Sequence, residues 1–316
     1  MTDMILHHYP ASPFAEKIRL MLGFKQLPWR SVHIPMVMPK PDLTALTGGY
    51  RRTPVAQVGA DIYCDTALIA RLLERTQPSP GLYPQAQAAS ANLLAQWADS
   101  TLFSAAVAFA FQPAGMQAMF GKLGPEQIAV FIEDRKQMRK GGNSPRMALD
   151  QAWGALLNFL PWLESQLAGQ DSAQPAFFCG SAASISDFSI FHPLWFIRRA
   201  GPLAALLDPY PNLAAWYARM NEFGRGTAAP ISSDDALVIA REAAPMDLPR
   251  VDLRQVDGCA AGDRVMVSAT DYGTDPASGE LVMSTIDEIV IKRHDQRAGN
   301  VQVHFPRFGY RIVNAP

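Results

Sequence analysis

Hydrophobic and polar positions follow three different patterns along this chain of 316 residues. Up to about residue 84, short runs of alternating polarity are separated by segments with helical spacing. Residues 85–245 then carry apolar positions at helical spacing throughout, and β-branched runs return in residues 246–316. A period of two predicts strands and a period near 3.6 predicts helices. The chain therefore divides into an α/β unit, an all-helical unit and a small antiparallel β unit.

The first unit, residues 1–84, has the order β-α-β-α-β-β-α. The runs "MILHHY" and "WRSVHIPMV" predict two strands joined through a helix over residues 13–24, so these strands should be parallel. A short helix is expected in "KPDLTALT". "VAQV" and "DIYC" flank a Gly-Ala pair and predict an antiparallel hairpin, and a helix over residues 65–76 closes the unit.

The helical unit, residues 85–245, should hold five or six helices. Its most apolar run, residues 102–111, spans about half of the roughly 20 residues that a membrane helix needs. We therefore expect a buried core helix there and no membrane association. Pro161 lies inside a helical pattern and predicts a kink or a new helix start.

The β unit, residues 246–316, contains "DRVMVSA", "LVMSTIDEIVIK", "NVQVHF" and "YRIV", separated by turn sequences. These runs predict a barrel or a curled antiparallel sheet. Three roles are open for it: it narrows a ligand pocket, it forms a dimer contact or recruits a partner, or it only stabilises the rest of the chain.

Composition excludes several classes of protein. The net charge of −1 gives no basic field, so nucleic acid is not an expected partner. The three cysteines lie far apart without a CxxC pair, which excludes a disulfide framework and a zinc ribbon and fits a reducing cytosol. His7 and His8 point to opposite faces of a strand, so no metal site is expected there. With no recognisable signal peptide, we expect a cytoplasmic protein.

Ser12 stands at the start of the first predicted helix, directly before Pro13. Serine is a preferred N-cap and proline is favoured at the first helical position, so Ser12 can be a helix cap only. Alternatively, the unpaired N–H groups and the positive end of the helix dipole hold an anion there. A hydroxyl that donates to a thiolate would lower the pKa of the thiol. Both interpretations stay open at this point.

Two further signals occupy the strand and helix starts that follow. In "RRTPVAQV", Thr53 is biased towards extended geometry by Pro54, which stands directly before a strand. In "YCDTALIARLLE", Asp65 and Thr66 open a helix. Asp65 is either an N-cap or the partner of a ligand ammonium, with Thr66 and nearby N–H groups taking the ligand's carboxylate.

The order of these motifs resembles the glutathione transferase superfamily over about residues 4–230. The motifs are "SPFAEKIRL", "RRTPV", "DTALI" and, in the helical unit, "SISDF". The resemblance implies a thioredoxin-like N-terminal domain and an all-α glutathione-transferase C-terminal domain. The β unit lies outside this pattern.

The resemblance also implies roles for particular residues. Ser12 matches the serine or cysteine that activates the sulfur of glutathione, the expected co-substrate. Thr53 matches the residue that pairs with the cysteinyl part of the tripeptide, and Pro54 matches the family's cis-proline. Asp65 and Thr66 match the pair that holds the γ-glutamyl end. Further matches are Arg52, which falls near the glycyl carboxylate but is equally well an exposed arginine, and Ser184 with Asp187, which correspond to an N-capping box.

Serine in place of cysteine bears on the reaction. Ser12 cannot form a mixed disulfide, so the resemblance implies glutathione as a nucleophile in conjugation, dehalogenation, isomerisation or peroxide reduction. Tyr9 is a rival donor to the thiolate, and we favour Ser12. Residues expected beside a small apolar electrophile are Tyr9, Phe14, Phe103, Phe109, Phe111 and Met116, although an aromatic stripe there is also typical of a core.

Two classes of function remain open. The first is a glutathione-dependent transferase, favoured by the presence of Ser12, Thr53-Pro54 and Asp65-Thr66 together. The second is a catalytically silent relative that binds a ligand or another protein, an interpretation that the additional β unit favours. The resemblance implies a homodimer in either case.

Overall fold

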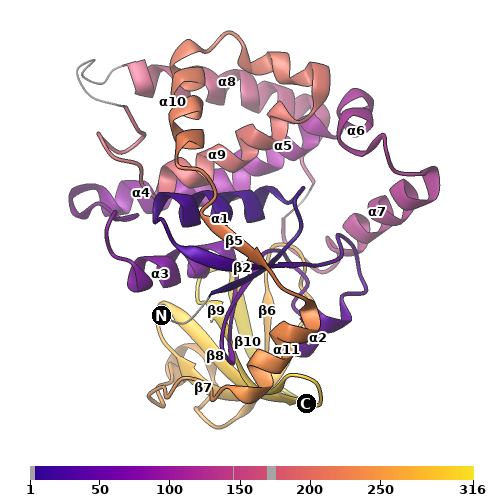
Figure 1. The fold of residues 1–316 in the computed structure, drawn as a ribbon, viewed down its shortest axis with the longest axis vertical. Coiled ribbons are helices and arrows are strands. Elements are labelled where there is room, and N and C mark those ends of the chain that lie inside the picture. Colours follow the sequence, from indigo (N-terminus) through magenta and orange to yellow (C-terminus); the bar gives the residue numbers. More distant parts are fainter. Residues whose placement is uncertain (1–3, 145, 169–175) are drawn as a thin grey trace.

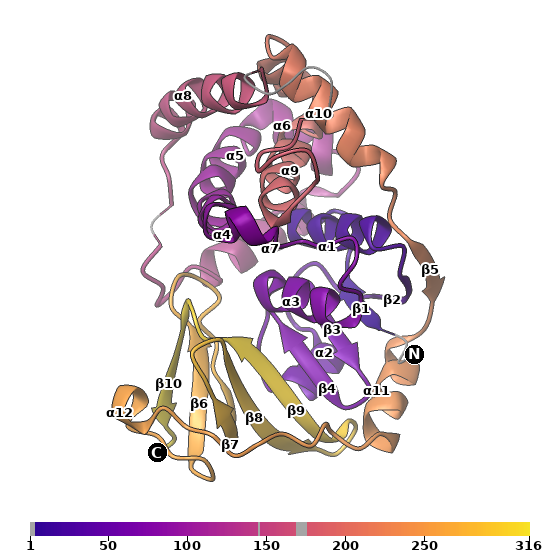
Figure 2. The same ribbon diagram turned by 90° about the vertical axis from the view of Figure 1, so that its left-hand side faces the viewer.

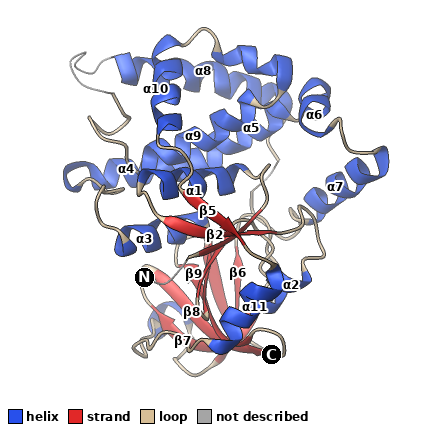
Figure 3. Cartoon of the chain, in the orientation of Figure 1, coloured by secondary structure: helices blue, strands red, loops and turns tan. Residues whose placement is uncertain are grey.

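The computed structural model describes residues 4–144, 146–168 and 176–316. A helical bundle stands on a central α/β domain, and a sheet of C-terminal strands continues below it (Figures 1 and 2). Figure 3 shows that most helices gather at one end of the molecule and the strands at the other, where a few helices lie beside the sheet. The expected fold class is thus confirmed: a thioredoxin-like domain, an all-helical glutathione-transferase domain and a C-terminal antiparallel β region.

All the strands of the described residues join one sheet, in the order β10-β6-β7-β8-β9-β4-β3-β1-β2-β5. Alternating side chains of its central strands point into two different cores, as a period of two requires. Leu6 and Tyr63 face the helical bundle, whereas their neighbours Ile5 and Ile62 face the opposite core, which continues into the C-terminal strands. The sheet therefore connects all three parts of the chain.

The N-terminal domain follows the expected order closely. The first two strands are parallel, and the hairpin pairs Val55 with Cys64. Burial raises the pKa of the Cys64 thiol, in agreement with a cysteine that packs as a small hydrophobe. Its elements are β1 (Ile5–His8), α1 (Pro13–Phe24), β2 (Pro28–His33), α2 (Pro41–Thr47), β3 (Val55–Val58), β4 (Asp61–Cys64) and α3 (Thr66–Thr76).

The helical domain opens with a helical stretch, Gln85–Ala110, that is long and apolar enough to span a membrane by length and composition alone. In the structure its second half is used for packing, since Leu102, Ala106 and Phe109 are buried in the bundle. The expected capping box forms, because the Asp187 carboxylate accepts from Ser184 N at 2.9 Å. The elements are η1 (Gln85–Gln87), α4 (Ala88–Trp97), the π-helical turn η2 (Ala98–Leu102), α5 (Phe103–Ala110), α6 (Pro113–Phe120), α7 (Pro125–Gln137), α8 (Leu149–Ala168), α9 (Ile185–Arg198), η3 (Gly201–Leu207) and α10 (Pro211–Glu222).

Two details of this region differ from expectation. Helix α8 continues through Pro161, so no new helix starts there. The segment after α10 leaves the bundle: β5 (Thr227–Pro230) pairs with β2, and α11 (Ser233–Glu242) packs on α2 and β9. The sequence of β5 has no alternation of polar and apolar residues, so the pattern alone did not reveal this strand.

The C-terminal strands do not form a separate barrel. They continue the central sheet, because β9 pairs in parallel with β4. The run "LVMSTIDEIVIK" is split into two antiparallel strands by a tight turn, in which Thr285 N donates to the Glu288 carbonyl at 2.8 Å. This β module comprises α12 (Arg254–Asp257), β6 (Arg264–Ala269), β7 (Ala277–Ser284), β8 (Glu288–Asp295), β9 (Gly299–Pro306) and β10 (Tyr310–Asn314).

Candidate functional site

A cavity of about 650 Å³ lies where the three parts of the chain meet. The N-terminal domain contributes the turn after β1 and the segment before β3, and the helical domain contributes residues of α5, α6, α7 and α9. Asp271 and Tyr272, from the loop between β6 and β7, complete the wall. The β module is thus part of the site, as one of the three expectations for its role required.

Ser12 both caps α1 and lines the cavity. Its Oγ accepts a hydrogen bond from Ala15 N at 3.2 Å, and its side chain is almost fully buried. Capping uses a lone pair of the oxygen and leaves the hydroxyl proton available. Within the described residues the Ser12 hydroxyl has no acceptor for that proton, so it is available to a ligand. The two interpretations of Ser12 are therefore compatible.

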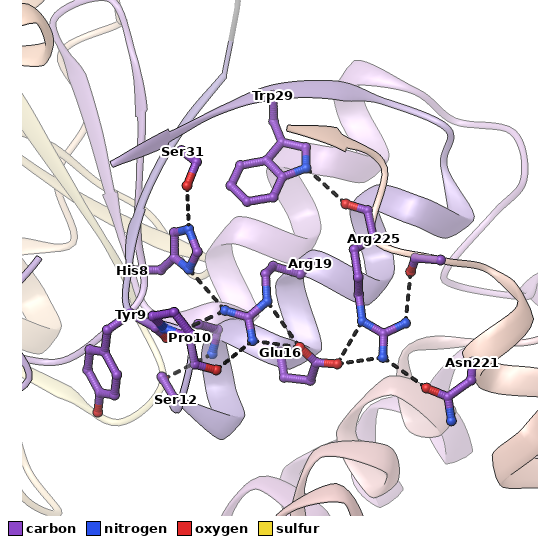
Figure 4. Close-up of polar contacts among 12 residues, drawn as sticks. His8, Tyr9, Pro10, Ser12, Glu16, Arg19, Trp29, Ser31, Asn221 and Arg225 are labelled. Carbon is purple, nitrogen blue, oxygen red and sulfur yellow. Dashed lines mark hydrogen bonds and ion pairs between the residues drawn. The ribbon is translucent and has the colours of Figure 1, made fainter. Parts of the chain in front are cut away.

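The helix that carries Ser12 is fixed by a buried ionic network (Figure 4). The Glu16 carboxylate accepts from Arg19 at 2.6 Å and from Arg225 Nε at 2.7 Å. Arg19 also donates to the Pro10 carbonyl at 3.1 Å and pairs with His8 Nδ1 at 2.9 Å. Burial, followed by the charge of Arg19, lowers the pKa of His8 to about 3, so its imidazole is neutral and accepts this bond. The network ties the turn before Ser12 to the chain that follows α10.

Thr53 lines the cavity beside a lysine that sequence analysis did not single out. The Thr53–Pro54 peptide bond is cis, as the resemblance implied. Lys40 Nζ donates to Thr53 Oγ1 at 3.0 Å and to the Arg51 carbonyl at 3.2 Å. Burial, followed by the charge of Arg135, lowers the pKa of Lys40 to about 7. Lys40 is therefore a buried amine on the cavity wall that is only partly protonated near pH 7 and is positioned by neutral groups.

Arg52 lines the cavity, but its guanidinium is held by the β module. It forms an ion pair with Asp271 and donates from Nε to the Tyr272 carbonyl at 3.0 Å. The Tyr272 ring stacks on the guanidinium, with 4.1 Å between the ring centroid and Cζ. Arg52 is thus neither the exposed arginine of one interpretation nor free for a ligand carboxylate.

Asp65 and Thr66 do not line the cavity. The Asp65 carboxylate caps α3 by accepting from Ala67 N at 3.0 Å, and it accepts from the Tyr310 hydroxyl at 3.0 Å. Arg52 lies 3.7 Å from the same carboxylate. Thr66 is buried and accepts from Lys17 Nζ at 3.4 Å. The structure does not bring this pair to the cavity wall with Ser12 and Thr53.

Asp99 is a cavity residue that the sequence pattern did not reveal. It lies in the π-helical turn η2, a form frequent at functional sites. Its Oδ2 lies 2.6 Å from Lys17 Nζ, and its Oδ1 accepts from His192 Nε2 at 2.9 Å. Burial opposes ionisation, but the Lys17 charge and the bond from His192 outweigh it and lower the pKa of Asp99. An ionised carboxylate therefore faces the cavity.

The apolar part of the cavity is mostly as expected. Tyr9, Phe14, Phe103, Phe111 and Met116 line it. Phe109 does not: it is buried in the bundle and packs against Trp153, with ring centroids 5.3 Å apart. The helix turns the Phe109 side chain away from the cavity, so its assignment to the second-substrate pocket was wrong.

The loop between β6 and β7 also fastens the segment that follows α7. Gly273 N donates to the Met138 carbonyl at 2.5 Å, and Asn143 N donates to the Thr270 carbonyl at 2.9 Å. Gly142 packs against the loop so closely that a Cβ there would lie 1.8 Å from the Asp271 carbonyl oxygen. Figure 2 shows this end of the β module beside the segment after α7. One loop thus fixes two walls of the cavity.

No group of three or more histidine, cysteine or acidic side chains with a geometry for a metal ion occurs among the residues that the structure describes. The two adjacent histidines have different hydrogen-bond partners: His7 bonds with Gln57 at 2.8 Å and His8 with Ser31 at 2.9 Å. Hydroxyls, carboxylates and cationic side chains are among the polar groups that line this cavity.

Comparisons with known proteins agree with this architecture. Residues 6–81 match the N-terminal domain and residues 146–219 the C-terminal domain of glutathione S-transferases. A GST-like protein from Pseudomonas syringae, solved as a crystal structure, is 44% identical, with all of both chains covered and a TM-score of 0.81. The chain belongs to the glutathione S-transferase family. Because the Pseudomonas chain is covered completely, the β module is shared with it.

Two more distant proteins are similar over somewhat less than three quarters of the chain. FtsZ-localized protein A of Caulobacter vibrioides is 25% identical over 242 residues, which cover 73% of this chain and 92% of the relative. The β-etherase LigF of Sphingobium sp. strain SYK-6 is 18% identical, with 70% of this chain and 95% of that chain covered and a TM-score of 0.50. This second likeness is one of fold.

Proposed function

We propose that this protein is a glutathione-dependent transferase in which the Ser12 hydroxyl stabilises the thiolate of bound glutathione. One observation carries the proposal: Ser12 lines the cavity with a hydroxyl proton that no described residue accepts, and Thr53, which precedes the cis-proline, lines the same cavity. A hydrogen bond to a charged group contributes about 1.5–3 kcal/mol, which corresponds to a pKa decrease of roughly one to two units. That decrease ionises a useful fraction of the thiol at neutral pH.

The cavity offers partners for both ends of the tripeptide. Lys40 lies beside Thr53, where the cysteinyl part would lie, and we assign it to the glycyl carboxylate, whose charge would favour the protonated amine. Arg52 was expected there, but Asp271 and Tyr272 hold it. Asp99 and Asp271 are the carboxylates on the cavity wall, and each already has a cationic partner. We assign Asp99 to the γ-glutamyl ammonium, because each carboxylate oxygen can accept a second hydrogen bond. Asp65 and Thr66 then anchor the β module and α1 instead of the ligand.

The reaction follows from this placement. The thiol proton leaves to solvent, and the sulfur attacks an electrophilic atom of the second substrate, which lies against the aromatic wall. A new bond forms to sulfur, and the leaving group departs with the electron pair of the bond that breaks. Ser12 keeps its own proton and only donates a hydrogen bond. Conjugation and thiolytic dehalogenation follow this scheme directly.

Turnover of glutathione with a panel of aryl halides, epoxides, enones and hydroperoxides tests the proposal. We expect measurable second-order rates with at least one class, and a decrease of about tenfold or more in Ser12→Ala. Binding of glutathione without turnover of any electrophile would contradict the proposal.

The second candidate is a silent ligand-binding or protein-interaction module. It is favoured by the likeness to FtsZ-localized protein A, which is named for its association with another protein, and by the β module beyond the two usual domains. Under this alternative, a Ser12→Ala variant retains the protein's partner binding, and the electrophile panel stays unreactive.

We further propose a cytoplasmic homodimer. Helices α4 and α8 expose apolar side chains, including Leu93, Leu157 and Trp162, the last of which is 62% exposed. An exposed apolar surface of this kind is typical of a protein interface. Light scattering should give twice the mass of one chain, and Trp162→Glu should shift it to the mass of one. A wild-type mass of one chain would contradict the proposal.

A further inference from the structure

The cavity wall is strongly unbalanced in charge. Of the described residues that line it, seven are lysine or arginine and only two are aspartate. Both aspartates are already paired, Asp99 with Lys17 and Asp271 with Arg52. The cavity therefore presents net positive charge to any ligand, although the chain as a whole has a net charge of −1.

Several of these cations do have partners. Arg51 forms an ion pair with Asp134 at 2.6 Å, and Arg135 shares that carboxylate at 3.4 Å. Lys136 pairs with Glu133 on the outer surface of α7. Lys40 is the residue that the proposed function assigns to glutathione. None of these four needs a further anionic group.

Arg139 and Arg146 remain. Arg139 follows α7, and Arg146 lies in the segment that leads to α8. Neither side chain makes a hydrogen bond or an ion pair with any residue that the structure describes. Both residues are exposed in part. The partial burial of Arg139, followed by the charge of Arg146, lowers the pKa of Arg139, as expected for two cations that face one space. Two guanidinium groups on the wall of one cavity that no described residue pairs with favour an anion, since guanidinium binds carboxylate and sulfonate oxygens in pairs.

The apolar wall defines the rest of the ligand. The Phe111 ring makes edge contacts with Phe120, Phe131 and Phe196, with centroids 5.6–6.2 Å apart. Phe120 and Phe131 pack in a tilted arrangement, with centroids 4.8 Å apart. Phe111 directly follows α5, and the other three rings belong to α6, α7 and α9; all four line the same cavity as the two arginines. A ligand that reaches both must have an apolar, preferably aromatic body and one anionic group at its end.

We propose that the second ligand of this cavity is an aromatic organic anion, a carboxylate or sulfonate, whose charged group is bound by Arg139 and Arg146. This deepens the proposed function, because it replaces a neutral apolar electrophile by an anionic one. The same loop of the β module that holds Arg52 also fixes the segment carrying Arg139 and Arg146, through Gly273 N and Asn143 N. The β module thus shapes the site that selects the anion.

A matched pair of fluorescent probes tests the inference without glutathione. Anilinonaphthalene sulfonate and neutral phenylnaphthylamine share one aromatic body and differ in the sulfonate. We expect the sulfonate to bind about tenfold more tightly at low salt. Arg139→Gln and Arg146→Gln should each weaken sulfonate binding about three- to tenfold. This loss is smaller than for a buried ion pair, because solvent screens the charges of partly exposed arginines. Neither should change binding of the neutral probe.

Lys122→Gln is the matched control, since Lys122 is an exposed cation of the same domain outside the cavity wall. It should change neither affinity. Arg139→Lys should restore part of the sulfonate affinity. Equal affinity for the two probes, or equal losses of both in the arginine variants, would overturn the inference.

Turnover separates this inference from the proposed function. With glutathione, chlorodinitrobenzoate should react with a lower KM than chlorodinitrobenzene, and Arg146→Gln should remove the difference. If neither compound reacts but the sulfonate still binds through the arginines, the proposed function fails and the anion site stands. If both react with equal KM and the arginine variants change neither, the anion site fails and the transferase stands.

Discussion

The hydroxyl of Tyr310 donates a hydrogen bond of 3.0 Å to the carboxylate of Asp65. Tyr310 begins strand β10, and Asp65 is the N-cap of helix α3. The family resemblance implied that Asp65 binds the γ-glutamyl group of glutathione. Asp65, which was expected to face the ligand, is thus bound by a residue of the β module. Arg52, 3.7 Å from the same carboxylate, is held in the same way by Asp271.

This relationship predicts different effects for the two aspartates. Asp65→Asn should change the affinity for glutathione by no more than about twofold, because Asp65 lies outside the cavity. It should lower the free energy of unfolding by about 1–2 kcal/mol, because it weakens both the helix cap and the contact with Tyr310. Isothermal titration and urea unfolding measure the two quantities. A tenfold loss of glutathione affinity at unchanged stability would return the γ-glutamyl role to Asp65.

Asp99 is expected to bind the ammonium of glutathione. Its removal alone would leave Lys17 buried without a counterion, so the informative variant is Lys17→Met with Asp99→Asn. The wild type should bind glutathione about tenfold or more tightly than glutaryl-cysteinylglycine, which lacks the ammonium. The double variant should bind both equally. A preference that survives in this variant would show that another group binds the ammonium.

Gly142 tests whether the β module shapes the cavity. In Gly142→Ala the new methyl group would meet the backbone carbonyl of Asp271 at 1.8 Å, and a carbonyl of the chain cannot rotate away as a side chain can. We expect a loss of about 1–3 kcal/mol in unfolding free energy and weaker binding of cavity ligands.

Gly154→Ala is the control for this change. Gly154 lies in α8, and a methyl group added there would meet no atom within 4 Å, so the substitution should stabilise the protein by about 0.5–1 kcal/mol through helix propensity. Gly142→Ala with unchanged stability and binding would mean that the loop moves freely and does not fix the cavity wall.

His304 links the β module to the N-terminal domain in a pH-dependent way. Its ring nitrogens lie 2.6 Å from Glu288 and 3.0 Å from Asp61, and Tyr63 stacks on it. Burial favours the neutral ring, but the bonds to the two carboxylates outweigh it and raise the pKa of His304 above 6.5. The resulting stability is therefore complete below pH 6.5 and decreases as the pH rises through the folded-state pKa.

Unfolding free energies from pH 6 to pH 9 should reveal this decrease in the wild type, and hydrogen exchange should locate it at the β4–β9 pairing. His304→Gln should be less stable at pH 6 and should lose that part of the pH dependence. Parallel pH profiles of wild type and variant would contradict the assignment.

The elements with strong local signals could be predicted from the sequence. Pro13 after Ser12 marked the start of α1, and the Gly59-Ala60 turn set the register of β3 and β4. What the sequence did not reveal depends on contacts between distant residues. Nothing local in "NVQVHF" indicates that β9 pairs with β4, or that Arg52 meets a loop about 220 residues away.

The residues of the candidate site also fall into those with a local sequence signal and those without one. A motif or helix spacing placed four of the cavity residues: Ser12, Thr53, Phe103 and Phe111. The sequence did not reveal Lys40 and Asp99, because an isolated charged residue before α2 or inside a helix resembles a solvent-exposed surface residue. Phe109 was misassigned because composition does not show which way a helix faces; its neighbours α8 and α9 decide that.

The central claim is that the Ser12 hydroxyl stabilises the thiolate of bound glutathione. Ultraviolet titration of the thiolate in the protein complex, beside Ser12→Ala and Tyr9→Phe, tests it most directly. We predict that the thiol of bound glutathione ionises about one to two pH units below that of free glutathione. Ser12→Ala should remove this difference and, through loss of the helix cap, lower the free energy of unfolding by about 1 kcal/mol. Tyr9→Phe should retain the difference. An unshifted thiol in the wild type, or a shift that survives in Ser12→Ala, would contradict the account.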